Sequence, residues 1–478
     1  MSIQCSRSES VRSSSNVHEK LGLDSSLAEK AGGVDSIDSV GGGDIVNDLD
    51  NGVEIFKVGS DLVDFRTVGW QFAAIIFIKV QFATGVMSLP YALYELGAVG
   101  GAFSLVVWGA VNTYVGKVQG DFRNAHAGCH SIADMAQILG GPILREIIGV
   151  LFMIAFMLAA GSGILGVTVG LNALSGHAIC TVWWSFIATI VVAAIACTRK
   201  FEKMSWLTLV GFISIFIAVF IVVVGVTTLD RPAAAPQTGP YDLGYHAIGN
   251  PTFLASMVAT STIFVSSAAT AAYLPVMSEM KSPKDYNKAL YTAMGFVTAA
   301  YLSFSLVVYR WCGRWVATPS LGSAGPVVKK VAYGVALIGL FISAALYLHV
   351  AAKYVFVRIL RNSRHLQGNT LIHWGTWLAC VCCLSAISFI LVSAIPIFNY
   401  LIAMVGSIAY APIALIFPGW LWLYDHSDWW KRSIRHQAAY SFHWLLILAG
   451  SLVCIAGTYA VIKEIVNAYA TGVIGQSH

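Results

Sequence analysis

The segment Ile75–Tyr91 reads IIFIKVQFATGVMSLPY, and the segment Ser266–Val276 reads SSAATAAYLPV. Each places a cluster of small or hydroxylic residues a few positions before a Leu-Pro pair, inside an otherwise apolar run. Proline removes a helical hydrogen bond and clashes with the preceding turn, while glycine lets the backbone leave the helix at little steric cost. The two segments therefore predict two apolar helices that are interrupted in the same way.

The rest of the sequence has the composition of a membrane protein. Of its 478 residues, 57% are hydrophobic and 11% are charged, and the mean hydropathy is +0.71. An average soluble domain carries about 25% charged residues. A membrane helix needs about 20 consecutive apolar residues, and such runs recur from Trp70 almost to the C-terminus. We expect an all-α polytopic protein with the lipid bilayer as its partner and no nucleic-acid partner.

About eleven transmembrane helices are expected from the apolar runs and the turn and charge signals between them. The predicted spans are 69–92, 99–120, 143–173, 179–198, 205–228, 252–278, 289–312, 328–358, 371–393, 397–423 and 438–463. A short amphipathic helix at 131–139 precedes the third span. Lys and Arg gather in alternate loops, so the positive-inside rule predicts a cytoplasmic N-terminus and an external C-terminus.

Residues 1–66 differ from the rest, because they are rich in Ser, Gly, Asp and Glu and contain no apolar run. Such a segment cannot bury enough apolar surface to offset its chain entropy. We therefore predict a disordered cytoplasmic tail at 1–66, a membrane domain at 67–465 and a short C-terminal tail at 466–478.

The two interruptions fall in the first and sixth predicted spans. Since the repeat unit contains an odd number of helices, the second copy enters the membrane from the opposite side, which gives an inverted repeat of 67–228 and 252–423 followed by an extra helix at 438–463. Broken helices in inverted repeats are typical of secondary transporters, where they present backbone N–H and C=O groups at the bilayer midplane. The alternative is that the small residues only allow close helix packing. The matching positions and Leu-Pro endings favour the transporter.

At these motifs the sequence resembles a known family. ATGVMSLPYAL at 83–93 and LPVMSEMKSP at 274–283 are similar to segments of the amino acid/auxin permease family, particularly its fungal neutral amino-acid permeases, in the amino acid-polyamine-organocation superfamily. The resemblance runs from Asp64 to the last helix. It implies secondary active uptake of amino acids and a five-plus-five inverted repeat like that of the bacterial leucine transporter, with one extra C-terminal helix.

The resemblance also implies that the amino and carboxyl groups of the substrate lie against the two helix breaks. Carried onto this sequence, the substrate-binding residues are Gln81, Ala83, Thr84, Gly85, Ser266, Ser267 and Ala268. No Asp or Glu is expected at mid-membrane, so a positively charged substrate side chain would find no carboxylate to pair with. We therefore expect neutral amino acids, aliphatic and aromatic, as substrates.

The first span also carries Lys79, less than two turns before Gly85, where sodium-coupled relatives place a neutral ion-ligating amide. A fixed ammonium would repel sodium, and the eighth span offers only Ser343 as a mid-membrane hydroxyl. We therefore expect protons as the coupling ion, with Lys79 in the place of a metal, and no metal or cofactor. A lysine paired with carbonyls for stability alone is the alternative. His349 is interpreted either as a proton relay or as a hydrogen-bonded packing residue.

Two functions stay open from the sequence. The first is a proton-coupled symporter in the plasma membrane, or in the vacuolar membrane. The second is an amino-acid sensor that uses the same site and signals through its N-terminal tail with little flux. An enzyme is not expected, since no paired intramembrane carboxylates or activated nucleophile motif is apparent. Cys180 and Cys312 are both expected outside, which leaves a disulfide between them possible.

Overall fold

The computed structural model describes residues 68–82, 84–126, 129, 131–198, 201–360, 363, 365 and 370–472, and of residues 201–206, 208 and 271 only the backbone. The predicted tail at 1–66, the predicted binding residue Ala83 and the last six residues lie outside the described part of the chain. Nearly all of what is described is helical.

The described residues form fourteen α-helices, twelve of them longer than two turns, and short 3-10 or π-helical turns connect several of them. The α-helices are α2 (Trp70–Gln81), α3 (Leu89–Leu96), α4 (Ala98–Ala125), α5 (Ile132–Ser175), α6 (Thr181–Ala196), α7 (Phe201–Thr227), α8 (Phe253–Ser266), α9 (Leu274–Ser278), α10 (Tyr286–Cys312), α11 (Pro326–Leu360), α12 (Leu371–Ala394), α13 (Phe398–Met404), α14 (Phe417–Asp425) and α15 (Ile434–Ala470).

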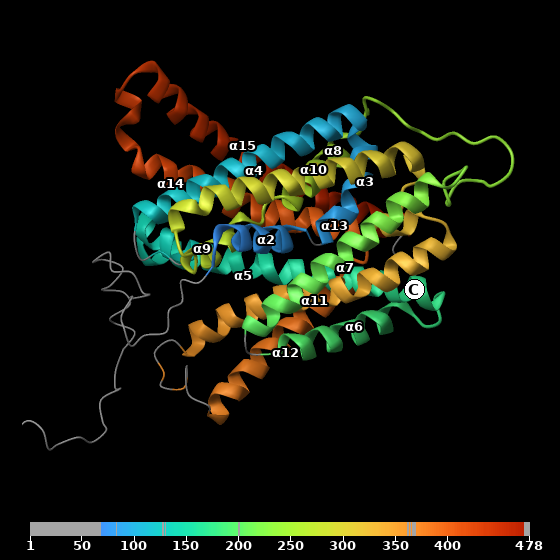
Figure 1. Ribbon diagram of the computed structural model, residues 1–478, viewed down its shortest axis with the longest axis horizontal. Helices are drawn as coiled ribbons and strands as arrows, with labels where there is room; N and C mark the ends of the chain where they lie inside the picture. Colours follow the sequence, from blue (N-terminus) through green and yellow to red (C-terminus); the bar gives the residue numbers. More distant parts are fainter. Residues whose placement is uncertain are drawn as a thin grey trace, which may run out of the picture.

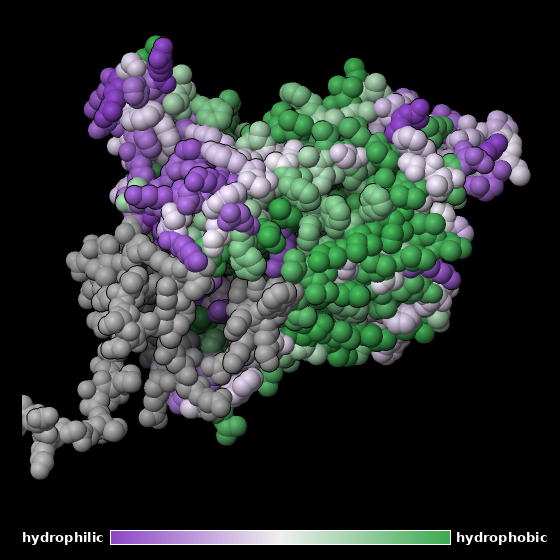
Figure 2. Space-filling model, in the orientation of Figure 1, coloured by the Kyte–Doolittle hydropathy of each residue, from purple (hydrophilic) through white to green (hydrophobic). Residues whose placement is uncertain are grey.

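The helices form one bundle whose members run mostly along its long axis (Figure 1). α11 packs along both α5 and α7, while α10 packs along α2 and α4. The loop between α7 and α8 projects from one end, and the turn between α14 and α15 projects from the other. In Figure 2, polar residues gather at these two ends, and the surface between the ends is apolar. This is the arrangement that a bilayer-spanning bundle requires.

Among the described residues, seven helices are long and apolar enough to cross a membrane, or up to nine if each of two bent pairs is one span. α6 and α8 are shorter apolar helices. The chain is a multi-pass membrane protein, and the count of eleven spans stays a prediction.

The N-terminal part of α5 is a separate short helix in front of the long span. Ser131 and Asp134 form a reciprocal capping box, with Ser131 Oγ accepting from Asp134 N at 3.3 Å and Asp134 Oδ2 accepting from Ser131 N at 3.0 Å. The helix breaks at Gly141, whose φ of +67° favours glycine, and Pro142 begins the long segment. This agrees with the amphipathic helix expected at 131–139.

The predicted span at 397–423 is not one straight helix. It bends by 43° between the segments Phe398–Tyr410 and Pro412–Asp425. Two π-helical turns, Val405–Tyr410 and Pro412–Ile416, stand at the bend. Pro412 supplies the physical reason, because it lacks the backbone N–H that a regular helix needs at this position.

The cysteines of the described chain are free thiols. Cys180 is exposed and Cys312 is buried, and no disulfide joins them. The disulfide that the sequence left possible is therefore absent from this structure.

The glycine-rich turn of α5 brings that helix against α11. A Cβ atom added to Gly163 would lie 2.7 Å from Ala344 Cβ and 3.0 Å from Ala344 Cα. We expect Gly163→Ala to lower the free energy of unfolding by about 1–3 kcal/mol, because the Ala344 backbone, and not a mobile side chain, would have to shift. Gly161→Ala is the control, because its added Cβ meets nothing closer than 3.8 Å. Thermal midpoints of the two purified variants in detergent test this, and equal midpoints would contradict it.

Candidate functional site

The two predicted helix breaks face each other in the middle of the bundle. α2 ends at Gln81 and the chain resumes in the 3-10 turn Thr84–Ser88, which leads into α3. α8 ends at Ser266 and the chain resumes in the turn Ala269–Tyr273, which leads into α9. A Cβ on Gly85 would lie 2.8 Å from Ser266 Oγ and 3.1 Å from Ser266 Cα. The two breaks approach this closely only because position 85 is glycine.

The side chain of Gln81 ties the two breaks together. Its Nε2 donates to the backbone oxygen of Ser266 at 2.7 Å. Its Oε1 accepts from Ala269 N at 3.3 Å and from the Tyr273 hydroxyl at 3.0 Å. The backbone oxygen of Gln81 accepts from the Tyr301 hydroxyl at 2.7 Å. Gln81 is 4% exposed, so these bonds act in a medium where an unpaired amide would be costly.

A second buried amide supports the break in α8. Asn112 on α4 donates through Nδ2 to the backbone oxygen of Phe264 at 3.1 Å and to Ser267 Oγ at 2.7 Å. The Phe264 carbonyl belongs to the last turn of α8 and Ser267 caps its end, where C=O groups have no partner within the helix. Side chains from neighbouring helices therefore satisfy backbone groups that the interruption frees.

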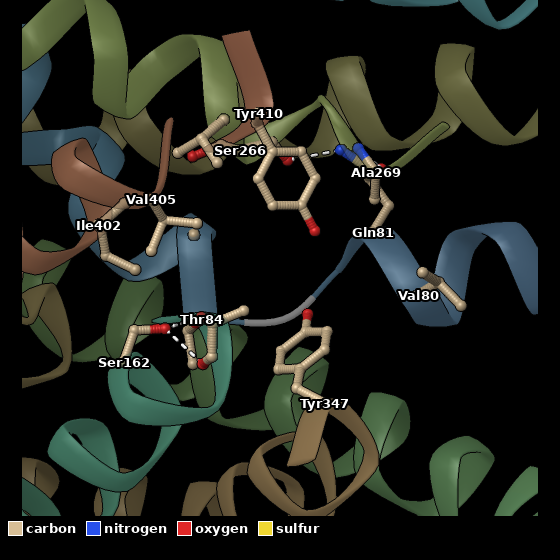
Figure 3. A pocket seen from close by; sticks show the side chains of 13 residues that line it. Val80, Gln81, Thr84, Ser162, Ser266, Ala269, Tyr347, Ile402, Val405 and Tyr410 are labelled. Carbon is tan, nitrogen blue, oxygen red and sulfur yellow. Dashed lines mark hydrogen bonds between the residues drawn. The ribbon is translucent and has the colours of Figure 1, made fainter. Parts of the chain in front are cut away.

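A cavity opens between the breaks (Figure 3). It encloses about 450 Å³ of empty space, a volume that includes the part open to solvent. The lining residues are Val80, Gln81, Thr84, Gly85, Ala159, Ser162, Val265, Ser266, Ala269, Tyr347, Ile402, Val405 and Tyr410. They come from both breaks and from α5, α11, α13 and its π-helical continuation.

The cavity wall is apolar with a few hydroxyl groups. Thr84 Oγ1 and Ser162 Oγ form a hydrogen bond of 3.5 Å. Tyr347 and Tyr410 point their hydroxyls into the cavity from opposite sides (Figure 3). None of the described lining residues carries a charge. The site can therefore hold an apolar group and offer polar contacts at the helix breaks, but it has no counter-ion for a charged side chain.

A family model described as "Transmembrane amino acid transporter protein" matches residues 66–463. The chain belongs to this family. A transmembrane transporter of Fusarium pseudograminearum is 46% identical over 423 residues, covering 88% of this chain and 89% of the relative. One of Gibberella moniliformis has the same identity and coverage. The N amino acid transport system protein of Neurospora crassa is 27% identical over 428 residues, covering 87% of this chain and 88% of the relative.

Solved structures of transporters are similar in fold. The inward-facing conformation of Mhp1 has a TM-score of 0.51 at 12% identity, covering 88% of this chain and 94% of that chain. A substrate-bound, outward-open Na⁺-coupled sialic acid symporter has a TM-score of 0.49 at 12% identity, covering 88% and 96%. At this identity the likeness to Mhp1 shows the fold alone, which is the leucine-transporter-like fold. The family and the fold predicted from the sequence are thus confirmed.

Some of the predicted binding residues line the cavity and others do not. Gln81, Thr84, Gly85 and Ser266 line the cavity. Ser267 and Ala268 do not line it, because Ser267 faces Asn112 and Ala268 is fully buried. Ala83 is outside the described residues. That the four lining residues bind substrate stays a prediction.

The predicted coupling residues lie apart from the cavity wall. Lys79 is 8% exposed on α2, one residue before the lining begins at Val80. His349 Nδ1 lies 3.1 Å from the backbone oxygen of Ala196, and its ring meets Trp377 edge-on. Ser343 is half-buried on α11. These surroundings match the packing interpretation of His349, and the coupling roles stay predictions.

Several cavity residues have no counterpart in the sequence motifs. Ser162, Tyr347 and Tyr410 come from three different helices and meet only through packing. A signal for Tyr410 did exist, since Gly406 and Pro412 interrupt the tenth predicted span. Ser162 stands in the glycine-rich stretch GSGILGVTVG at 161–170, a pattern that favours close helix packing and does not by itself indicate a cavity wall.

The closeness of Gly85 and Ser266 gives a direct test of the site. We expect Gly85→Val to abolish uptake of labelled leucine and phenylalanine, because the added side chain would force the two breaks apart. Gly295→Val on α10 is the matched control, as an added Cβ there meets nothing within 4 Å. Uptake is measured in cells and normalised to surface protein. An active, surface-delivered Gly85→Val variant would move the site elsewhere.

Proposed function

We propose that the protein is a proton-coupled symporter of neutral amino acids, aliphatic and aromatic, in the plasma membrane. The observation that carries this is the cavity between the two breaks, whose described wall contains backbone ends, hydroxyl groups and apolar side chains but no charge. Membership of the amino acid transporter family supports the amino-acid substrate. So does the name of the Neurospora crassa relative, an amino acid transport system protein.

The helix breaks supply groups that suit both ends of an amino acid. The turn that starts at Thr84 leads into α3 and carries N–H groups at the positive end of the helix dipole, where a carboxylate is stabilised. The last turns of α2 and α8 present C=O groups at their negative ends, where an ammonium is stabilised. In this proposal the substrate bridges the two breaks, and its main-chain charges need no ionised side chain.

The remaining wall defines the specificity. Ile402, Val405 and Val265 are apolar lining residues, and Tyr410 adds its ring to the same wall. A branched or aromatic substrate side chain would bury apolar surface here. A guanidinium or a second carboxylate would lose its hydration without gaining a partner.

This difference gives the test of the proposed function. In proteoliposomes, labelled leucine and phenylalanine should be taken up, whereas labelled arginine and glutamate should not, because the described wall has no compensating charge. Uptake should rise when the pH is lower outside than inside. Uptake of either charged amino acid would contradict the specificity, and binding without flux would indicate a sensor in place of a transporter.

Coupling is proposed to involve Lys79, whose ammonium lies buried in α2 close to the first break. A cation held there takes the place of a metal ion and disfavours sodium by charge repulsion. The neighbouring residues Val80 and Gln81 line the cavity, so a change in the charge at Lys79 would act close to the bound substrate.

We expect Lys79→Ala to reach the membrane and to take up substrate with little dependence on external pH, because the titratable group is gone. The measurement is leucine uptake across imposed pH gradients, normalised to reconstituted protein. Lys329→Ala, outside the cavity at the start of α11, is the control. Misfolding or an unchanged pH response would favour a purely structural lysine, and sodium-stimulated uptake by the unmodified protein would refute the proposal.

A further inference from the structure

A second cavity is lined in part by α8 and α13, which also line the first. It encloses about 420 Å³ of empty space including its opening, and its polar lining residues include Ser88, Glu95, Asn399, Tyr400 and Glu464. On α8, Thr262 of the second cavity lies one turn before Ser266 of the first. On α13, Asn399 likewise precedes Ile402. Since a helical turn rises about 5.4 Å, the two cavities lie about one turn apart along these helices.

The second cavity lies at the end of the bundle that the positive-inside rule predicts to be external. α3 ends beside it at Leu96, whose backbone oxygen accepts from Gly249 N of the α7–α8 loop at 3.1 Å. That loop projects from the same end in Figure 1. A substrate that enters from outside would therefore meet this cavity first.

Two carboxylates from different helices share the cavity. Glu95 is on α3 and Glu464 is on α15, and both side chains line this one cavity. Tyr400 donates its hydroxyl hydrogen to Glu464 Oε2 at 3.4 Å. Two like charges at a half-buried site repel each other, and a cation between them would relieve that repulsion.

Two further polar groups in the same wall lack partners. Asn399 is 5% exposed and Ser88 is fully buried. Neither Asn399 Oδ1 nor Ser88 Oγ has a hydrogen-bond partner among the described residues, although both residues line the cavity. A buried acceptor without a donor costs free energy, so these groups point to a ligand that brings donors.

We propose that this cavity binds the primary ammonium group of an incoming amino acid before the substrate reaches the first cavity. A primary ammonium carries three N–H donors and no acceptor, which complements two carboxylates and an unpartnered amide oxygen. A divalent metal fits less well, because the described residues contain no group of three His, Cys, Asp or Glu side chains that would hold one. The direction of travel rests on the proposed function, whereas the binding itself does not.

The probes separate the ammonium group from the rest of the substrate. 3-Methylbutylamine has the side chain and amine of leucine without the carboxylate, and 4-methylpentanoate has the carboxylate without the amine. The N-trimethylated form of 3-methylbutylamine keeps the positive charge but has no N–H donor. Only 3-methylbutylamine should both inhibit leucine uptake from outside and raise the thermal midpoint of the purified protein.

The variants test the named residues. In Glu464→Gln and Asn399→Leu, the inhibition constant of 3-methylbutylamine should rise about tenfold or more, since hydrogen bonds to a charged group are lost. The KM for leucine should rise while kcat changes little. Asn399→Leu removes an oxygen that has no partner among the described residues, so it should fold even if Glu464→Gln does not. Asp242→Asn, which removes an exposed external charge, is the control and should behave like the unmodified protein.

The outcomes distinguish this proposal from the proposed function. If 3-methylbutylamine raises the thermal midpoint of the unmodified protein but not that of the two variants, ammonium binding in the second cavity is supported, even if no amino acid is transported. If both variants take up leucine normally and the inhibition constant of 3-methylbutylamine is unchanged in them, the proposed ammonium site is wrong. The proposed transport function would be unaffected by that result. Equal potency of the trimethylated probe, or a variant effect on the pH dependence of uptake alone, would also overturn it.

Discussion

The amide side chain of Gln81 is the contact on which the centre of this protein depends. A helix that breaks inside a membrane leaves backbone N–H and C=O groups that water cannot reach. Gln81 offers a donor and an acceptor at once, and it uses both on the opposite break, at Ser266, Ala269 and Tyr273. Each interruption is therefore stabilised by the other. Gly85 completes the arrangement, since a larger residue would hold the two breaks apart.

Much of this was predictable from local signals. The paired small-residue clusters with Leu-Pro endings predicted both breaks, and the apolar periodicity predicted the helices that carry them. The motif at 83–93 also indicated Thr84 and Gly85 as parts of the site, which line the cavity. These features depend on short stretches of chain, where backbone conformation follows from residue type.

The rest depends on how distant helices pack, which local sequence does not encode. Tyr347 and Tyr410 face each other across the cavity because α11 and the π-helical turns after α13 approach from opposite sides. The bend at Pro412 has no matching proline in the fifth predicted span, 205–228, so no paired motif marks it in the sequence. The family resemblance implied Ser267 at the site, yet its hydroxyl accepts from Asn112 Nδ2 at 2.7 Å and does not line the cavity.

The hydrogen bonds divide the bundle into two groups of helices. Gln81 and Asn112 join the first break and α4 to α8 and α10. On the other side, Ser214 of α7 donates to the Val335 oxygen of α11 at 2.5 Å, and Trp377 of α12 donates to the Cys197 oxygen after α6 at 3.1 Å. Across the cavity, the bond between Thr84 and Ser162 is 3.5 Å long. Each group is thus braced internally while the cavity lies on their boundary, so rocking of one group against the other would open the site without breaking the bonds that hold the helix breaks together.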